Sequence, residues 1–272
     1  MGRYHVLEVL MRVFLLSATL LATAVTPLAG QAAADEIRAG QTARDSLDAE
    51  AALAHFERAA QLDSTNYEAN WRTALALIDV GAETPDTVKS PARDSMYALA
   101  ETYARRAVAL RPDDADGHFV LADAIGRASL TKGKRERVER AREIRDEALK
   151  AIQLNPKHDG AYHILGRWNA EIMRLSGVQR FVAKNFLGGA VFNQASWNGA
   201  VANLERAVEL DPQRIFHRLD LALVYIDLKR YAEAGTQLQR IAALPPSDPG
   251  DPEYKRQAAA LLARIATEHG SQ

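Results

Sequence analysis

The chain has 272 residues, of which 47% are hydrophobic, and its formal net charge is −1. This near-neutral balance excludes an overall attraction to nucleic acid or to anionic membranes. The absence of cysteine excludes disulfides, thiolate metal sites and a lipid anchor attached to cysteine.

Residues 1–34 have the layout of a secretory signal peptide. Arg12 precedes an uncharged apolar stretch at 13–25, and small residues follow it. A membrane-spanning helix needs about 20 apolar residues, and this stretch is shorter. The sequence therefore favours a cleaved signal over an uncleaved membrane anchor.

Two details of this segment stay open. Cleavage after Gly30 and cleavage after Ala34 both fit, and the chain could start at Met1 or at Met11. In each case we expect export to the periplasm or outside the cell, with membrane anchoring as the alternative. Residues 35–272 are expected to form a single helical-repeat domain.

One phrase recurs along this domain: an apolar helix end followed by Leu-x-Pro or a near equivalent. A proline at this place ends one helix, and its fixed φ suits the turn into the next. Pro212 and Pro246 are 34 residues apart, which is the period of the tetratricopeptide repeat (TPR). The phrase occurs at 61–64, 109–112, 153–156, 209–212 and 243–246.

The packing positions of the last complete unit agree with this period. Leu221, Ala222 and Tyr225 share one face of a first helix, and Tyr231 and Ala234 share one face of a second. The phase agrees across five units. We therefore predict an all-α, TPR-like α-α superhelix, a solenoid of about five helix-turn-helix units with a C-terminal capping helix.

The other spacings between the phrases exceed 34 residues, so long insertions should lie inside the repeats, between paired helices. The insertions are expected at 81–94, about 129–138, and 175–196. The helices are expected near 48–62, 67–80, 91–110, 115–130, 134–154, 159–176, 196–210, 214–228, 231–243 and 252–268.

Several sequence elements resemble the regulator of microtubule dynamics family of TPR-like proteins. The most specific is HILGRW at 163–168, followed by Gln179-Arg180-x-x-Ala183. The resemblance covers about residues 48–268 and implies the TPR-like fold. It also implies an association with microtubules and organelle contacts in eukaryotic members, but an exported chain would not meet cytoplasmic microtubules. The other elements are YEANWR at 67–72, ALKAIQLNPK at 148–157, FLG at 186–188 and ERAVELDP at 205–212.

In a TPR-like stack the first helices line a concave groove, and the repeat phase predicts which side chains face it. Mixed charge with a few apolar positions suits an extended peptide or a partner helix. The predicted partner-binding residues are Arg72, Phe119, Asp123, Arg127, His163, Arg167, Glu171, Arg174, Leu219, Leu223 and Asp227.

Arg167 is the favoured polar anchor of this groove. Its planar guanidinium can hold a carboxylate by two parallel hydrogen bonds. An internal ion pair between Arg167 and Glu171, four residues apart on one helix, is an equally weighted alternative.

The insertion at 178–192 combines several large apolar side chains with only two charged ones. A short helix folded back onto the stack, with its phenylalanines buried, is the favoured interpretation. The alternative is an exposed amphipathic lid that touches a membrane or a partner. The apolar residues are Phe181, Phe186, Leu187 and Phe192, and the charged ones are Arg180 and Lys184.

Residues 132–146 carry seven basic and four acidic side chains at helical spacing. This pattern favours a solvated helix with internal ion pairs, since the acidic residues cancel much of the positive field. No nucleic-acid partner is expected.

No pattern in the sequence indicates catalysis. The seven histidines do not show zinc-protease spacing, and Gly-rich phosphate loops and Gly-x-Ser-x-Gly turns are absent. Asp113 and Asp114 stand at a helix start, where carboxylates cap backbone N–H groups. No cofactor or metal is expected.

The sequence predicts a non-catalytic scaffold in the cell envelope that binds a protein or peptide. The alternative is a membrane-contact or lipid-associated protein, held by an uncleaved N-terminus or by residues 178–192. The oligomeric state stays open.

Overall fold

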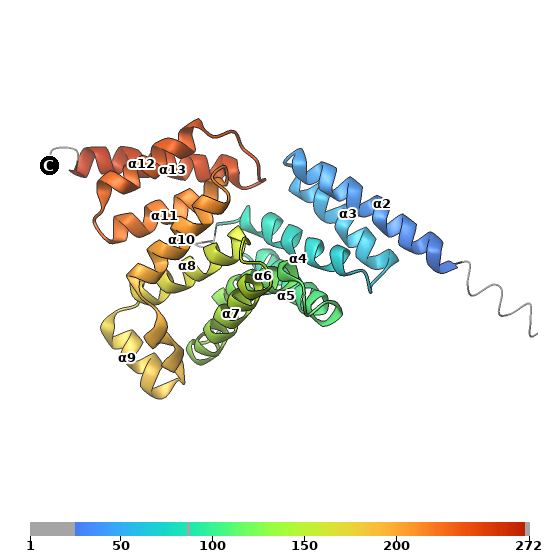
Figure 1. Cartoon of the computed structure of the whole chain (residues 1–272), viewed down its shortest axis with the longest axis horizontal. Helices are drawn as coiled ribbons and strands as arrows, with labels where there is room; N and C mark the ends of the chain where they lie inside the picture. Colours follow the sequence, from blue (N-terminus) through green and yellow to red (C-terminus); the bar gives the residue numbers. More distant parts are fainter. Residues whose placement is uncertain (1–24, 86–87, 270–272) are drawn as a thin grey trace, which may run out of the picture.

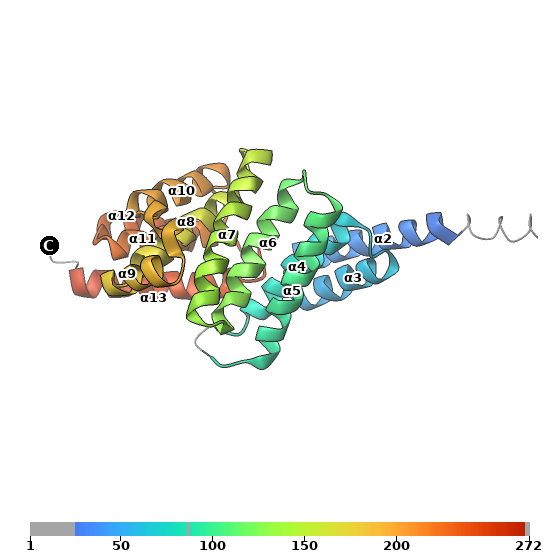
Figure 2. The same ribbon diagram turned by 90° about the horizontal axis from the view of Figure 1, so that it is seen from below.

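The computed structural model describes residues 25–85 and 88–269. Within these residues the chain forms helices and turns and no strand, which confirms the all-α class. Figures 1 and 2 show helix pairs that follow one another along the longest axis of the molecule. The pairs are α2 (Val25–Asp45) with α3 (Ala49–Leu62), α4 (Tyr67–Ala82) with α5 (Pro91–Leu110), α6 (Ala115–Ala128) with α7 (Lys134–Leu154), α8 (Asp159–Arg174) with α10 (Trp197–Leu210), and α11 (Ile215–Asp227) with α12 (Tyr231–Ala243).

A final helix, α13 (Asp251–His269), packs against α11 and α12. Five pairs and one closing helix confirm the predicted TPR-like solenoid. The helix ends also agree with the repeated phrase, since α3, α5, α7 and α10 each end on its leucine. Asp114 caps α6 as expected, because its carboxylate accepts from the backbone N–H of Asp116.

Helix α2 was not predicted, although it is the first helix of the first pair. Its side chains Ala33 and Ile37 are buried, and a Cβ at Gly40 would lie 2.6 Å from the Phe56 ring. Glycine therefore lets α2 approach α3 closely. The predicted signal peptide falls mostly on residues 1–24, which lie outside the described residues.

The insertions lie inside the repeats, as predicted. They comprise residues 83–90; the 3₁₀ turn η1 (Ser129–Thr131) with its flanking residues; and, between α8 and α10, the helix α9 (Gly177–Phe186) with the 3₁₀ turn η2 (Gly189–Gln194). The second insertion is shorter than predicted because α7 already begins at Lys134.

The third insertion folds differently from the favoured prediction. Phe192 is buried as expected, with 9% of its surface exposed. Phe181 and Phe186, however, are 60% and 72% exposed, so the expectation that the phenylalanines are buried was wrong for these two. The physical reason is that α9 contacts the stack through Ala183, on the other side of the helix.

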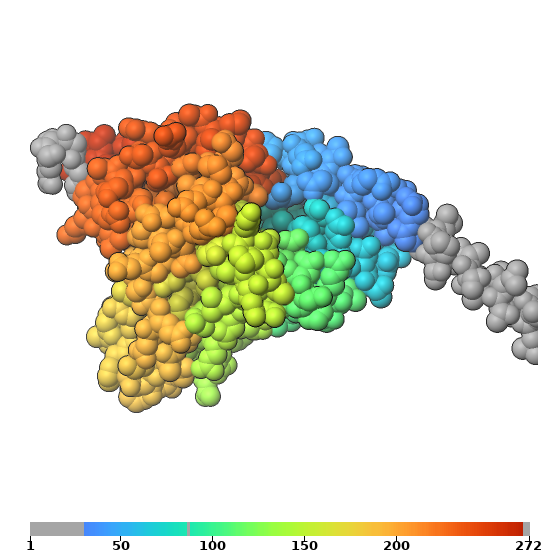
Figure 3. Space-filling model, in the orientation of Figure 1, coloured from blue at the N-terminus to red at the C-terminus, as the bar shows by residue number. Residues whose placement is uncertain are grey.

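The two ends of the stack meet. Arg44, at the end of α2, donates to the Asp248 carboxylate at 2.5 Å, although 204 residues separate them. Asp248 also accepts from Arg214, the residue before α11. The superhelix therefore curls until its first pair reaches the loop before α13, and in the space-filling view these two parts form one continuous surface (Figure 3).

Candidate functional site

Charged residues of four first helices act electrostatically on one tyrosine of the closing helix. Burial raises the pKa of Tyr254, on α13, and the charges of Arg127, Asp220, Asp79 and Arg167 also act on its hydroxyl. These four come from α6, α11, α4 and α8. We call these five residues the polar centre. Sequence reasoning missed Tyr254, Asp220 and Asp79, because none of them belongs to a TPR motif.

Asp220 is the main partner of the residues predicted on α8. Its Oδ2 lies 3.0 Å from Nε2 of His163 and 3.4 Å from Nε of Arg167. Burial opposes ionisation of this carboxyl, but the charge of Arg167 and the hydrogen bond from His163 outweigh it and hold the pKa of Asp220 far below its usual range. The carboxylate is therefore ionised, and its Oδ2 is paired with both side chains of α8.

The predicted ion pair between Arg167 and Glu171 does not form. Glu171 instead accepts from Arg174 at 2.6 Å, and Arg174 also donates to Asp227 at 2.7 Å. The pairs cross from α8 to α11 because the two first helices lie side by side in the superhelix. Arg167, the favoured anchor for a partner's carboxylate, already has a carboxylate partner of its own.

Two histidines lie against each other behind this surface. Nδ1 of the fully buried His217 lies 3.0 Å from Nδ1 of His163. The Nε2 atoms of the two rings face Asp159 at 2.9 Å and Asp220 at 3.0 Å. Each ring therefore contacts one carboxylate through Nε2 and the other ring through Nδ1.

Burial shapes the acid–base behaviour of this site. It lowers the pKa of His217 to about 4, although Asp159 opposes the shift. The pKa of Asp159 falls to about 2, because the hydrogen bond and charge of His217 outweigh the effect of burial. Burial raises the pKa of Asp79 to about 6, with Arg44 opposing.

The predicted residues of the N-terminal repeats also have partners within the chain. Arg72 donates to Glu68 at 2.8 Å and stands over the Trp71 ring at 4.5 Å. Arg127 lies 3.6 Å from Asp123, four residues earlier on α6.

Two of the predicted groove residues are buried. His163 and Leu219 are only 4% and 3% exposed, so their predicted role as contact residues is corrected. Phe119 packs between α6 and α8, with its ring 4.7 Å from the ring of His158. A Cβ at Gly160 would lie 2.6 Å from it. For the other predicted residues, contact with a partner stays a prediction.

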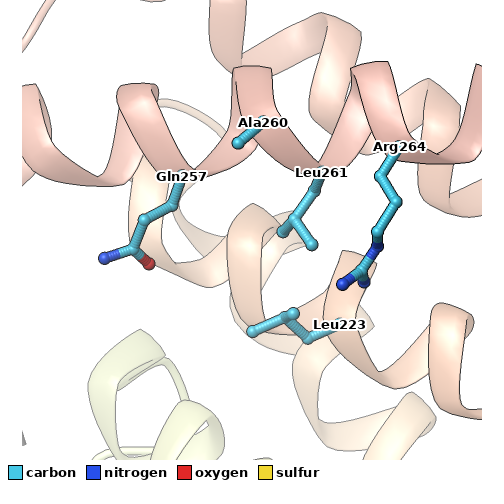
Figure 4. A pocket seen from close by; sticks show the side chains of 5 residues that line it. All are labelled: Leu223, Gln257, Ala260, Leu261 and Arg264. Atoms are coloured by element: carbon cyan, nitrogen blue, oxygen red, sulfur yellow. The ribbon is translucent and has the colours of Figure 1, made fainter. Parts of the chain in front are cut away.

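A pocket of about 380 Å³ opens beyond the polar centre, between α11 and α13. Figure 4 shows Leu223 facing Leu261 across it, with the Arg264 guanidinium reaching over Leu223. Ala260 and Gln257 complete the lining. Of the predicted groove residues, Leu223 alone lines this pocket.

Within residues 25–85 and 88–269, no group of three or more His, Asp or Glu side chains is arranged to hold a metal ion. None of the helices in these residues has both the length and the apolar character needed to cross a bilayer.

Comparison with known proteins gives a family match. The family described as "Regulator of microtubule dynamics protein 1-3" matches residues 32–266. Bovine regulator of microtubule dynamics protein 1 is 28% identical over 203 residues, which span 74% of this chain and 62% of the bovine protein. The human protein is 26% identical over 202 residues, which span 73% and 62%. The match thus spans less than two thirds of these relatives.

Solved structures show the same fold. A thermophilic TPR protein of Thermus thermophilus has a TM-score of 0.62 and 20% identity, over 85% of this chain and 100% of that one. Pseudomonas aeruginosa PilF has a TM-score of 0.50 and 14% identity, over 90% and 95%. At these identities the likeness extends to the fold alone.

Proposed function

The chain belongs to the regulator of microtubule dynamics protein 1-3 family, and from that premise we propose that it is a non-catalytic scaffold that binds a protein or peptide on its concave side. The TPR-like fold supports this proposal, since stacked helix pairs create extended concave binding surfaces. The observation that carries it is the pocket between α11 and α13, where apolar and hydrogen-bonding side chains meet on the first-helix side of the stack.

The residues that line the pocket determine which chemical groups of a partner can bind there. Leu223 and Leu261 provide an apolar wall, and Arg264 and Gln257 can donate hydrogen bonds at its rim. An apolar side chain of an extended peptide fits against the leucines, while a carboxylate or carbonyl oxygen next to it meets Arg264. The charged residues of the polar centre already form ion pairs within the chain, so we place the partner at this C-terminal end of the curve.

Paired substitutions test the site. We expect Leu223→Asp combined with Arg264→Glu to lose the partners that the wild-type chain retains from an extract of its own source cells. Arg256→Glu is the matched control, because Arg256 is on the same helix but is exposed and paired with Glu253. Partner sets compared by quantitative mass spectrometry should match between wild type and control. An unchanged set in the double variant would contradict the proposal.

We further propose that the chain is exported after cleavage following Gly30. Cleavage after Ala34 would remove Ala33, which is fully buried in the first helix pair, whereas a start at Gln31 keeps it. Intact-mass measurement of the protein from the cell envelope should give a chain that begins at Gln31. A chain that keeps residues 1–30 would contradict the cleavage, and a membrane-bound one would favour the anchored alternative.

A further inference from the structure

Helix α9 projects from the stack with an apolar face turned to solvent. Figures 1 and 3 show it at the lower edge of the molecule, beyond α8 and next to α7. Val178, Phe181, Val182 and Phe186 lie on this face, and they are 74%, 60%, 40% and 72% exposed. The two phenylalanine rings are 6.3 Å apart. We call these four residues the α9 face.

The stack holds this face outward. Ser176 and Gln179 form a capping box at the start of α9, so the helix has a fixed beginning. Arg180 donates to the carbonyls of Met173 at 2.8 Å and Leu175 at 2.5 Å, which fixes α9 to the end of α8. The α9 face is therefore preorganised, and its exposure follows from the packing of the opposite side.

The surroundings of the α9 face are positively charged. Residues 172–204 contain no Asp or Glu, whereas the whole chain has a net charge of −1. Lys184 is exposed on α9 itself. The first turns of α7 pack against the insertion through Val138. Residues 132–142 carry six basic side chains, among them the exposed Lys134, and two acidic ones, so the net charge of this segment is positive. Arg142 of α7 donates to the carbonyl of Gly188, two residues after the end of α9, at 3.1 Å.

We propose that the α9 face docks on an anionic lipid surface. Its valine and phenylalanine side chains enter the boundary between headgroups and acyl chains, and Lys184 and Lys134 contact the acidic headgroups. The combination of aromatic and aliphatic side chains with flanking cations is what this boundary binds. A second copy is disfavoured, since it would bring like charges together.

Vesicle binding by the full chain tests the proposal. We expect it to bind vesicles of phosphatidylcholine with about one third phosphatidylglycerol more tightly than vesicles of phosphatidylcholine alone. Phe181→Ser with Phe186→Ser should weaken binding to the anionic vesicles about tenfold or more. Lys184→Glu with Lys134→Glu should remove the preference for them. Leu149→Ser is the control, because Leu149 is a partly exposed leucine near the opposite end of α7.

A probe on α9 separates this surface from the apolar N-terminal segment. The chain has no cysteine, so Val178→Cys can carry a single environment-sensitive dye. Anionic vesicles should shift the emission of this dye to the blue, while a dye on Leu149→Cys should not respond. Vesicle binding without a response at position 178 would overturn the proposal.

The two other occupants are also outcomes of the test. If the serine variant binds vesicles like the wild type but loses a protein partner, the α9 face serves that partner and the lipid proposal fails. If light scattering shows a wild-type dimer and a monomeric serine variant, with no vesicle binding by either, a second copy covers the face and the proposal fails as well.

Discussion

The polar centre and the α9 face differ in how many of their side chains find a partner or a packing neighbour within the chain. In the polar centre, Asp220 takes both His163 and Arg167 as partners, and neighbouring first helices supply them. On the α9 face, Phe186 remains 72% exposed. The concave curve is therefore strongly self-paired at its middle, while the convex insertion carries unsatisfied apolar surface. The concave shape of a repeat protein therefore does not by itself show which side chains are left without partners inside the chain and can bind another molecule.

Among the changes that test this comparison, replacing Asp220 should have the largest effect on the free energy of unfolding. We expect Asp220→Ala to lower the free energy of unfolding by about 3–5 kcal/mol, because it leaves the Arg167 guanidinium and the buried His163 ring without their carboxylate partner. Urea unfolding followed by circular dichroism measures this change. A loss under about 1 kcal/mol would mean that the polar centre is solvated and open to a partner after all.

A smaller contrast lies within the insertion itself. Phe192→Ala should cost about 3 kcal/mol, because it removes a buried ring from the cluster around Trp168. Phe186→Ala should change the free energy of unfolding by less than about 0.5 kcal/mol. Both values come from the same urea measurement. Equal losses would show that Phe186 is packed in solution, and the distinction between the two sides of α9 would fail.

The helix ends and repeat phase could be predicted from sequence because they depend on local chemistry. Leucine followed by a turn residue and proline determines where α5, α7 and α10 end, whatever the rest of the chain does. Helix α2 was not predicted because the small residues at 25–34 also fit the cleavage region of a signal peptide. The small side chains of its glycine and alanine residues matter only for the close packing against α3, which the sequence of α2 alone does not show.

The site was less predictable because its pairs depend on the curvature of the superhelix. His163 and His217 are 54 residues apart, and they meet only where α8 and α11 lie side by side. Phase along one helix shows which residues share a face, but not which charge faces it from the next repeat. For α9, periodicity similarly revealed apolar side chains without showing which side the stack would cover.

The smallest effect is a pH dependence that Asp79 and His217 produce together. The pKa of Asp79 is raised from 3.8 to about 6, so between these values the folded state binds more protons, and this group adds stability as the pH falls. The pKa of His217 is lowered from 6.5 to about 4. The unfolded state therefore binds its proton first, and this group removes stability as the pH falls. The two contributions oppose each other over the same window.

The variant Asp79→Asn removes the titration of Asp79 and leaves that of His217. We expect the wild-type urea midpoint to change little between about pH 6 and about pH 4, and the midpoint of the variant to fall steadily, because only the His217 contribution remains. At about pH 7 the variant should be at least as stable as the wild type, since burial disfavours an ionised Asp79. Parallel pH profiles for the two proteins would show that Asp79 is solvated. Asp79 would then be as accessible to solvent as the α9 face. The contrast between the two regions would depend only on the ion pairs between α8 and α11.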